Sequence, residues 1–286
     1  MGRVIFKTIV SGTYELPFVL LNLIELYDIC DEFLITESDY THVGEFKGFD
    51  FENCFNNHIK NEFPKAKYVQ MKQAATMSLW SPSDENDNNL RKNEQKIRNG
   101  FLEFIDPLDP EDIMISVDGD EVLYNSKTLR GLIAFLKLNR LGSPRSFTLS
   151  LNQFFYYLNL QVPKYEFYGP VVCNVSFFFE SPEPHWRYLG KRILRPLGCH
   201  FSWVMSPDEM LQKISRYAHR DRLAHLMNLE TLQEMRFLQL NLMEPNREFN
   251  PKSISSSSNK IFPSKLFRIK ELVSKDLVLN SDTFWH

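Results

Sequence analysis

The first 140 residues of the chain alternate between short apolar, β-branched runs and longer segments whose apolar residues recur near the helical period. This alternation predicts an α/β fold with a mostly parallel sheet, because strands separated by helices return to the sheet in the same direction. We expect strands over residues 4–10, 32–37, 67–71 and 112–117, and helices over residues 16–27, 51–63, 88–105 and 126–138.

The second half of the chain has a different pattern. Residues 146–197 are rich in aromatic and β-branched side chains with Pro and Gly between them, which favours short strands. A helix is predicted to begin after Ser206, a good N-cap that is followed by Pro207 and two acidic residues. We assign residues 1–245 to one domain and residues 246–286 to a C-terminal tail, whose Ser-rich stretch is expected to form a loop that lets the tail dock on the domain.

Composition excludes several classes of protein. The chain has 33 basic and 36 acidic residues, so its net charge of −3 argues against nucleic-acid binding through bulk charge. We find neither a run of about 18 apolar residues, which a membrane helix needs, nor a signal-peptide pattern, and therefore expect a soluble, cytoplasmic protein. The four cysteines form no C-x-x-C pair, which argues against a zinc site. The sequence also lacks the glycine-rich dinucleotide fingerprint and the P-loop.

The sharpest motif is Asp118-Gly119-Asp120-Glu121, which directly follows an apolar run. It is therefore expected at the carboxyl end of a strand, the edge where open α/β sheets bind ligands. Two carboxylates separated by glycine can face one hard divalent cation such as Mg²⁺ or Mn²⁺, which prefers oxygen ligands and often bridges to phosphates. The simpler interpretation is an acidic turn in solvent, because short motifs of this kind often carry no site.

Three functions are compatible with this motif. The first is metal-dependent transfer of a sugar from a nucleotide diphosphate. The second is a phosphatase with an aspartyl-phosphate intermediate, which would use Asp118 as nucleophile but also needs a later lysine and a second acidic pair at a strand end. The third is a non-catalytic glycan-binding protein that has kept the fold.

Polar residues elsewhere add candidates, each with a structural alternative. His200 lies between aromatic residues and can be a metal ligand or a core histidine. Lys213 and Arg216 recur on one side of a predicted helix, which suits phosphate binding or a solvated face. Arg91 and Arg98 recur on the helix before the acidic motif and either pair within that helix or face a nucleotide.

Taken together, these motifs resemble glycosyltransferase family 17 from about Ile5 to about Arg222. The strings that carry the resemblance are Tyr14-Glu15-Leu16, Phe33-Leu34-Ile35-Thr36-Glu37-Ser38, the acidic motif, Phe155-Tyr156-Tyr157-Leu158-Asn159, Gly169-Pro170-Val171-Val172, and Gly198, His200, Phe201 and Ser202 with Glu209, Lys213, Ala218 and His219 after them. Their order and spacing are more specific than any one of them.

The resemblance implies a GT-A-like fold and an inverting transfer from a UDP-sugar to a glycan or glycoprotein, such as an N-glycan. GlcNAc is the sugar that the family suggests, with xylose or another hexose as alternatives. Mn²⁺ or Mg²⁺ would be held by Asp118, Asp120 and His200. The implied general base is Glu209, with Glu180 as the second candidate. The implied donor-binding residues are Glu37, Arg91, Arg98, Asp118, Lys213 and His219.

Overall fold

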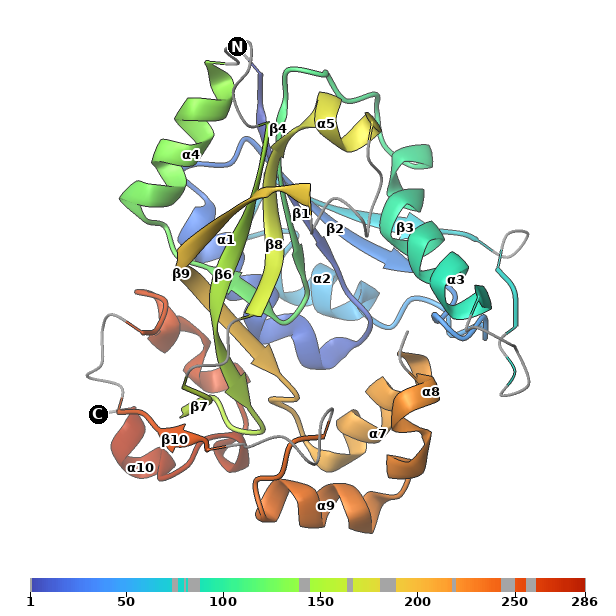
Figure 1. Cartoon of the computed structure of the whole chain (residues 1–286), viewed down its shortest axis with the longest axis vertical. Coiled ribbons are helices and arrows are strands. Elements are labelled where there is room, and N and C mark those ends of the chain that lie inside the picture. Colours follow the sequence, from blue (N-terminus) through green and yellow to red (C-terminus); the bar gives the residue numbers. More distant parts are fainter. Residues whose placement is uncertain are drawn as a thin grey trace.

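The computed structural model describes residues 2–73, 77–79, 81, 88–138, 145–163, 167–180, 189–217, 220–242, 250–255 and 261–285. A ten-stranded sheet runs through the molecule, with helices on both of its faces (Figure 1). Its main path follows the order β10-β7-β6-β8-β4-β1-β2-β3, and β9 joins β5 to β6. The strands are β1 (Val4–Ile9), β2 (Glu32–Ser38), β3 (Ala66–Met71), β4 (Ile113–Asp118), β5 (Glu121–Leu123), β6 (Ser146–Phe155), β7 (Leu160–Gln161), β8 (Phe167–Asn174), β9 (Lys191–Ser202) and β10 (Lys252–Ser253).

The first four strands form the parallel part of the sheet, with β1 between β2 and β4. Side chains alternate along β1 between the two faces of the sheet. On one face, Phe6 belongs to a core with residues of α1 (Leu16–Leu26), α2 (Glu52–His58) and α4 (Lys127–Lys137). Ile5 packs on the other face, with the residues around α3 (Asn88–Asn99) and α5 (Val175–Glu180). The α/β architecture predicted from the sequence is confirmed.

The remaining strands make the sheet mixed. β8 is antiparallel to both β4 and β6, whereas β9 is parallel to β6 and antiparallel to β5. β6 and β9 have ten and twelve residues and are longer than the short strands that Pro and Gly led us to expect. β9 continues through Pro196, where its register against β6 shifts, and it brings His200 opposite Glu121. The acidic motif and His200 are thereby brought together.

Helices of the C-terminal half form a second core. α7 (Pro207–Arg216) begins as predicted, with a capping box between Ser206 and Glu209. It packs with α8 (Arg220–Leu223) and α9 (Leu229–Phe237) around a cluster that includes Tyr156 and Trp203. Among the described residues, no helix is both long and apolar enough to span a membrane.

Most of the described C-terminal tail packs on the domain. It contains α10 (Ser281–Phe284), and the carbonyl of Leu277 accepts a hydrogen bond of 2.8 Å from the backbone N–H of Leu158. The buried Glu25 carboxylate of α1 accepts from the Ser264 hydroxyl and from the Lys265 N–H, at 2.9 and 2.6 Å. The Ser256–Lys260 stretch lies outside the described residues.

A buried asparagine fixes the strand that follows the acidic motif. The Asn22 side chain donates to the carbonyl of Glu121 at 2.7 Å and accepts from the N–H of Leu123 at 3.0 Å. It thus makes the two hydrogen bonds that the backbone of a neighbouring strand would make with β5. Asn22 is fully buried, so an apolar side chain here leaves two backbone groups unpaired.

We therefore predict that Asn22→Leu lowers the free energy of unfolding by about 1–3 kcal/mol for each group left unsatisfied. Urea denaturation measures the loss. Asn56→Leu, at an exposed position of α2, is the control and should stay within about 0.5 kcal/mol of wild type as a surface change. Equal stability of Asn22→Leu and wild type would contradict the proposed role of Asn22.

Candidate functional site

A cavity of about 290 Å³ opens at the carboxyl ends of β1, β2 and β4. Its far wall comes from the ends of β6 and β9 and from α7. The polar side chains among its lining residues are Ser11, Glu15, Ser38, Tyr40, Thr41, His42, Lys47, Arg98, Asp118, Asp120, Gln153, His200, Ser202, Lys213, Arg216, Tyr217 and Arg222. The acidic motif thus lies at the edge of the sheet where the sequence predicts it.

Glycine is required at the centre of the acidic motif. A Cβ atom on Gly119 would lie 2.6 Å from Cδ of Glu15 and 3.0 Å from the carbonyl oxygen of Ile9. A side chain here would therefore push the Glu15 carboxyl away and make a tight contact with the backbone of Ile9. Gly119 therefore allows the Glu15 carboxyl to pack against the turn between the two aspartates.

Asp118 is held by an arginine from α3. Arg98 donates from Nη1 to Oδ1 of Asp118 at 2.7 Å and from Nη2 to Oδ2 at 3.3 Å. Nε of the same guanidinium donates to Glu94 at 3.1 Å, which fixes the orientation of Arg98 one turn along the helix. A two-bond contact of this kind holds both partners in one geometry.

Asp120 has two partners, one on each carboxylate oxygen. Lys213 Nζ donates to Oδ2 at 2.8 Å, and His200 Nε2 lies 3.5 Å from Oδ1. Burial alone would raise the pKa of Asp120, but Lys213 and His200 lower it well below its usual range. Burial would likewise lower the pKa of Lys213, and Asp120 more than reverses this. Both groups are therefore charged at neutral pH, although they are only 5% and 9% exposed.

The other ring nitrogen of His200 orients the imidazole. Nδ1 lies 2.8 Å from Oε1 of Gln153, an oxygen that can only accept, so Nδ1 carries a proton. The other ring nitrogen, Nε2, faces Oδ1 of Asp120. Histidines that bind metals are commonly oriented in this way by a hydrogen bond from the other nitrogen. Phe167 covers the ring, with the two centroids 4.0 Å apart.

Part of this arrangement can hold the divalent cation that the sequence predicts. Among the described residues, no three His, Cys, Asp or Glu side chains are grouped to hold a metal ion. Asp120 and His200 nevertheless present an oxygen and a nitrogen to one another, whereas Asp118 is engaged by Arg98. Mg²⁺ in proteins commonly uses one or two carboxylates and completes its coordination with substrate phosphates and water. These residues therefore suit a cation that arrives with a phosphorylated ligand.

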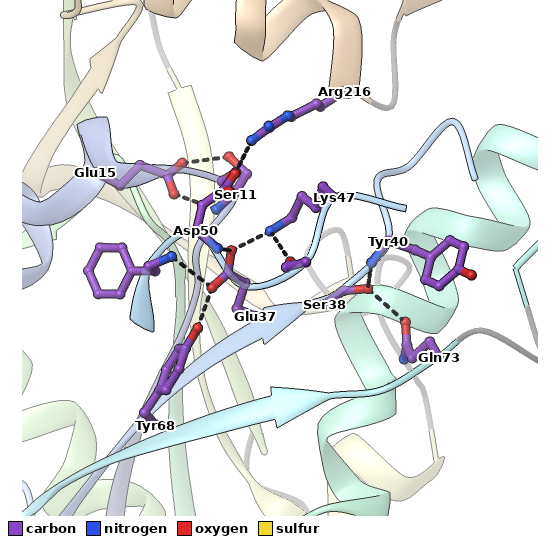
Figure 2. Close-up of polar contacts among 12 residues, drawn as sticks. Ser11, Glu15, Glu37, Ser38, Tyr40, Lys47, Asp50, Tyr68, Gln73 and Arg216 are labelled. Atoms are coloured by element: carbon purple, nitrogen blue, oxygen red, sulfur yellow. Dashed lines mark hydrogen bonds and ion pairs between the residues drawn. The ribbon is translucent and has the colours of Figure 1, made fainter. Parts of the chain in front are cut away.

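Glu15 also lines the cavity, and its environment differs from that of Asp118 and Asp120. Its carboxylate accepts from the Ser11 backbone N–H at 2.6 Å and from the Ser11 hydroxyl at 3.1 Å (Figure 2). The described residues place no Lys, Arg or His in ion-pair contact with it. Burial raises the pKa of Glu15 to about 8, despite the opposing effect of Lys213. Glu15 is therefore a stronger base than an ordinary carboxylate.

Glu37, which we expected to bind the donor, is not among the described residues that line the cavity. Its buried carboxylate accepts from the backbone N–H groups of Asp50 and Phe51, both at 3.0 Å, and from Lys47 and Tyr68 (Figure 2). These bonds fix the loop over residues 39–51. The loop carries Lys47, which does line the cavity, so Glu37 acts on the site through the loop.

Glu209, Glu180 and Arg91 are not among the described residues that line the cavity. Glu209 closes the capping box at the start of α7. Glu180 is exposed at the end of α5 and pairs with Arg145. Arg91 pairs with Glu94 at 3.3 Å, and its side chain is 40% exposed. His219 lies outside the described residues.

Several cavity residues had no predicted role, and Lys47, Gln153 and Glu15 are among them. Lys47 and Gln153 lie in a loop and a strand where no local motif marks them. Glu15, by contrast, follows the first strand and so belongs to the same sheet edge as the acidic motif. Applying the strand-end rule to that strand would have identified Glu15.

The site was then compared with known proteins. A model of glycosyltransferase family 17 matches residues 2–244. The chain belongs to this family. The resemblance carried by the sequence motifs is thereby confirmed, and this family 17 chain is a sugar-transferring enzyme. The phosphatase and the non-catalytic glycan-binding protein are set aside.

Solved structures show more distant similarity. An active-site mutant of LgtC is 12% identical to the chain, with 71% of this chain and 73% of that chain covered and a TM-score of 0.33. The galactosyltransferase LgtC in complex with donor and acceptor sugar analogues is 11% identical, with 76% and 82% covered and a TM-score of 0.33. No curated protein matches the chain.

The buried Glu37 leads to a prediction for stability. Glu37→Gln leaves Lys47 without its counter-charge in a buried position, a change that typically costs about 3–5 kcal/mol. We expect a loss of this size in urea denaturation. Glu32→Gln, on the same strand but paired with the exposed Arg3 and Lys67, is the matched control and should lose under about 1 kcal/mol for each exposed pair. Similar losses in the two variants would contradict the anchoring role of Glu37.

Proposed function

We propose that this family 17 enzyme transfers a sugar from a UDP-sugar to a hydroxyl of a glycan or glycoprotein, with inversion at the anomeric carbon and with Mn²⁺ or Mg²⁺ as cofactor. One observation carries the proposal: the Asp118-Gly119-Asp120 turn opens into a cavity that gathers cationic side chains from separate parts of the chain. Those cations are Lys47, Arg98, Lys213, Arg216 and Arg222.

The balance of charge in the cavity suits a nucleotide diphosphate. Among the described lining residues, five Lys and Arg side chains face three carboxylates. Phosphate oxygens bind well to such cations, because hydrogen bonds between two charged groups are stronger than neutral ones. A diphosphate offers these side chains phosphate oxygens in addition to their carboxylate partners, and it supplies phosphate oxygens to a cation on Asp120 and His200.

The chain's own residues support departure of UDP. Lys213 and Arg98 are positively charged and preoriented next to the acidic turn, so they stabilise negative charge that develops on the leaving diphosphate. A cation held by Asp120 and His200 would neutralise the same charge as a Lewis acid. Asp118, bound by both Nη groups of Arg98, keeps that arginine in place.

Inversion by a single displacement requires a base that takes the proton from the acceptor hydroxyl. Among the described carboxylates of the cavity, Asp118 and Asp120 are ion-paired and Glu15 is not. The pKa of Glu15 is raised and that of Asp120 is lowered. Carboxylates whose pKa values are shifted apart often have different roles in acid–base catalysis. We therefore propose Glu15 as the base, since Glu209 and Glu180 do not line the cavity.

The identity of the donor and the presence of the cation are tested together by thermal unfolding. UDP and a panel of UDP-sugars, including those of GlcNAc, xylose, glucose and galactose, are added with Mn²⁺ and then with EDTA. A ligand at about 100 times its Kd stabilises the native state by about 2.7 kcal/mol. We expect stabilisation that needs Mn²⁺ and is largest for one sugar.

The variants Asp120→Asn and His200→Ala should lose the Mn²⁺-dependent part of this shift while their unliganded unfolding stays cooperative. Glu209→Gln is the control and should keep the full shift. Absence of any shift with every nucleotide, with or without Mn²⁺, would overturn the proposed function.

A kinetic experiment tests Glu15. Glu15→Gln keeps the size of the side chain and removes the basic oxygen, so sugar transfer should fall by about 10²–10⁴-fold, the usual contribution of a general base. UDP affinity should change little, and NMR of the product should show the inverted linkage in the wild type. Transfer at the wild-type rate in Glu15→Gln would assign the base to another residue.

A further inference from the structure

Lys213 occupies the position at which a cation would meet Asp120. Its ammonium lies 2.8 Å from Oδ2 of Asp120, on the carboxylate whose other oxygen faces His200. The ammonium also lies 5.0 Å from the centre of the Trp203 ring, a cation–π contact. Asp120, the best-placed metal ligand, is thus already paired with a buried positive charge.

The two aspartates of the motif are held in unequal ways. Asp118 receives two bonds from the planar guanidinium of Arg98, which is itself fixed by Glu94. Asp120 receives a single bond from the ammonium of Lys213, at the end of a flexible four-carbon chain. A lysine is a point charge that can exchange partners, whereas an arginine in a two-bond contact is tied to one geometry. Asp120 is therefore the aspartate whose partner can be exchanged.

We propose that Lys213 is an internal counter-ion that competes with the divalent cation for Asp120 and is transferred to the diphosphate when cation and nucleotide bind together. This inference rests on the proposed function. A divalent cation next to a buried ammonium is repelled, so the cation alone binds weakly. A diphosphate provides a new partner for Lys213 and removes the repulsion, because a buried charge is stable only when it is paired.

Cooperative binding follows from this exchange. If UDP raises the affinity for the cation, the cation must raise the affinity for UDP by the same factor. A site built in this way keeps its carboxylate paired when it is empty and takes up the cation with the donor.

The test counts free Mn²⁺ by electron paramagnetic resonance during titration of the protein without nucleotide. Lys213→Met removes the competing charge, so Mn²⁺ alone should bind at least about ten-fold more tightly than to wild type. Lys67→Met removes an exposed positive charge on β3, away from the residues that line the cavity, and is the matched control, expected to stay near wild type. In Lys213→Met with Asp120→Asn, the gain should disappear.

A second measurement uses the unaltered enzyme. In wild type, saturating UDP should tighten Mn²⁺ binding by at least about ten-fold, and most of this coupling should be lost in Lys213→Met. Lys213→Gln provides a second uncharged variant, and urea denaturation establishes that each variant is folded.

Two results would overturn the inference: independent binding of Mn²⁺ and UDP to wild type, or unchanged or weaker Mn²⁺ binding in a folded Lys213→Met or Lys213→Gln. Either result leaves the transferase assignment intact as long as UDP with Mn²⁺ stabilises the wild type. Failure of every nucleotide to bind would instead remove the proposed function.

Discussion

Parallel pairing of β1 with both β2 and β4 is the constraint on which the rest of the structure depends. The register places Ile9 beside Asp118 on one side and beside Thr36 on the other, so the three strands end together. The segments that leave these ends then share one edge of the sheet. The first carries Glu15, the second leads into the loop of Lys47, and the third is the acidic turn. A shift of one residue in any pairing would turn these strand ends to the opposite face.

Buried ion pairs connect the segments that meet at this edge of the sheet. Burying a single ion is costly, so each buried charge must have a partner, and the partners come from distant parts of the chain. Glu37 holds the loop of Lys47 and Asp50, and Asp50 in turn accepts from Arg216 of α7 (Figure 2). The pairs that stabilise the cavity also preorient the cations that a diphosphate needs. The same contacts therefore serve both stability and binding.

The cavity exists only because the two halves of the chain meet there. β9 runs beside β6 and brings His200 to the acidic turn, and α7 follows with Lys213. At the end of α7, the carbonyl of Arg216 accepts a hydrogen bond of 3.2 Å from the N–H of His42, in the loop after β2. This contact joins α7 to the loop on the other side of the cavity.

The sequence by itself determined the α/β fold, the position of Asp118 and Asp120 at a strand end, the start of α7 and the family. Each of these depends on local information: the hydrophobic period, the residues of a cap, or a motif in a fixed order. Tertiary structure alone decided which charges meet. It paired Arg98 with Asp118 and Lys213 with Asp120, bonded Glu37 to the backbone of the loop that carries Lys47, and placed Glu209 in a helix cap. The physical reason is that ion pairing depends on distances of a few ångströms between residues far apart in the chain. Lys213 and Asp120 are 93 positions apart and Arg216 and Asp50 are 166 apart, and no local pattern specifies such distances.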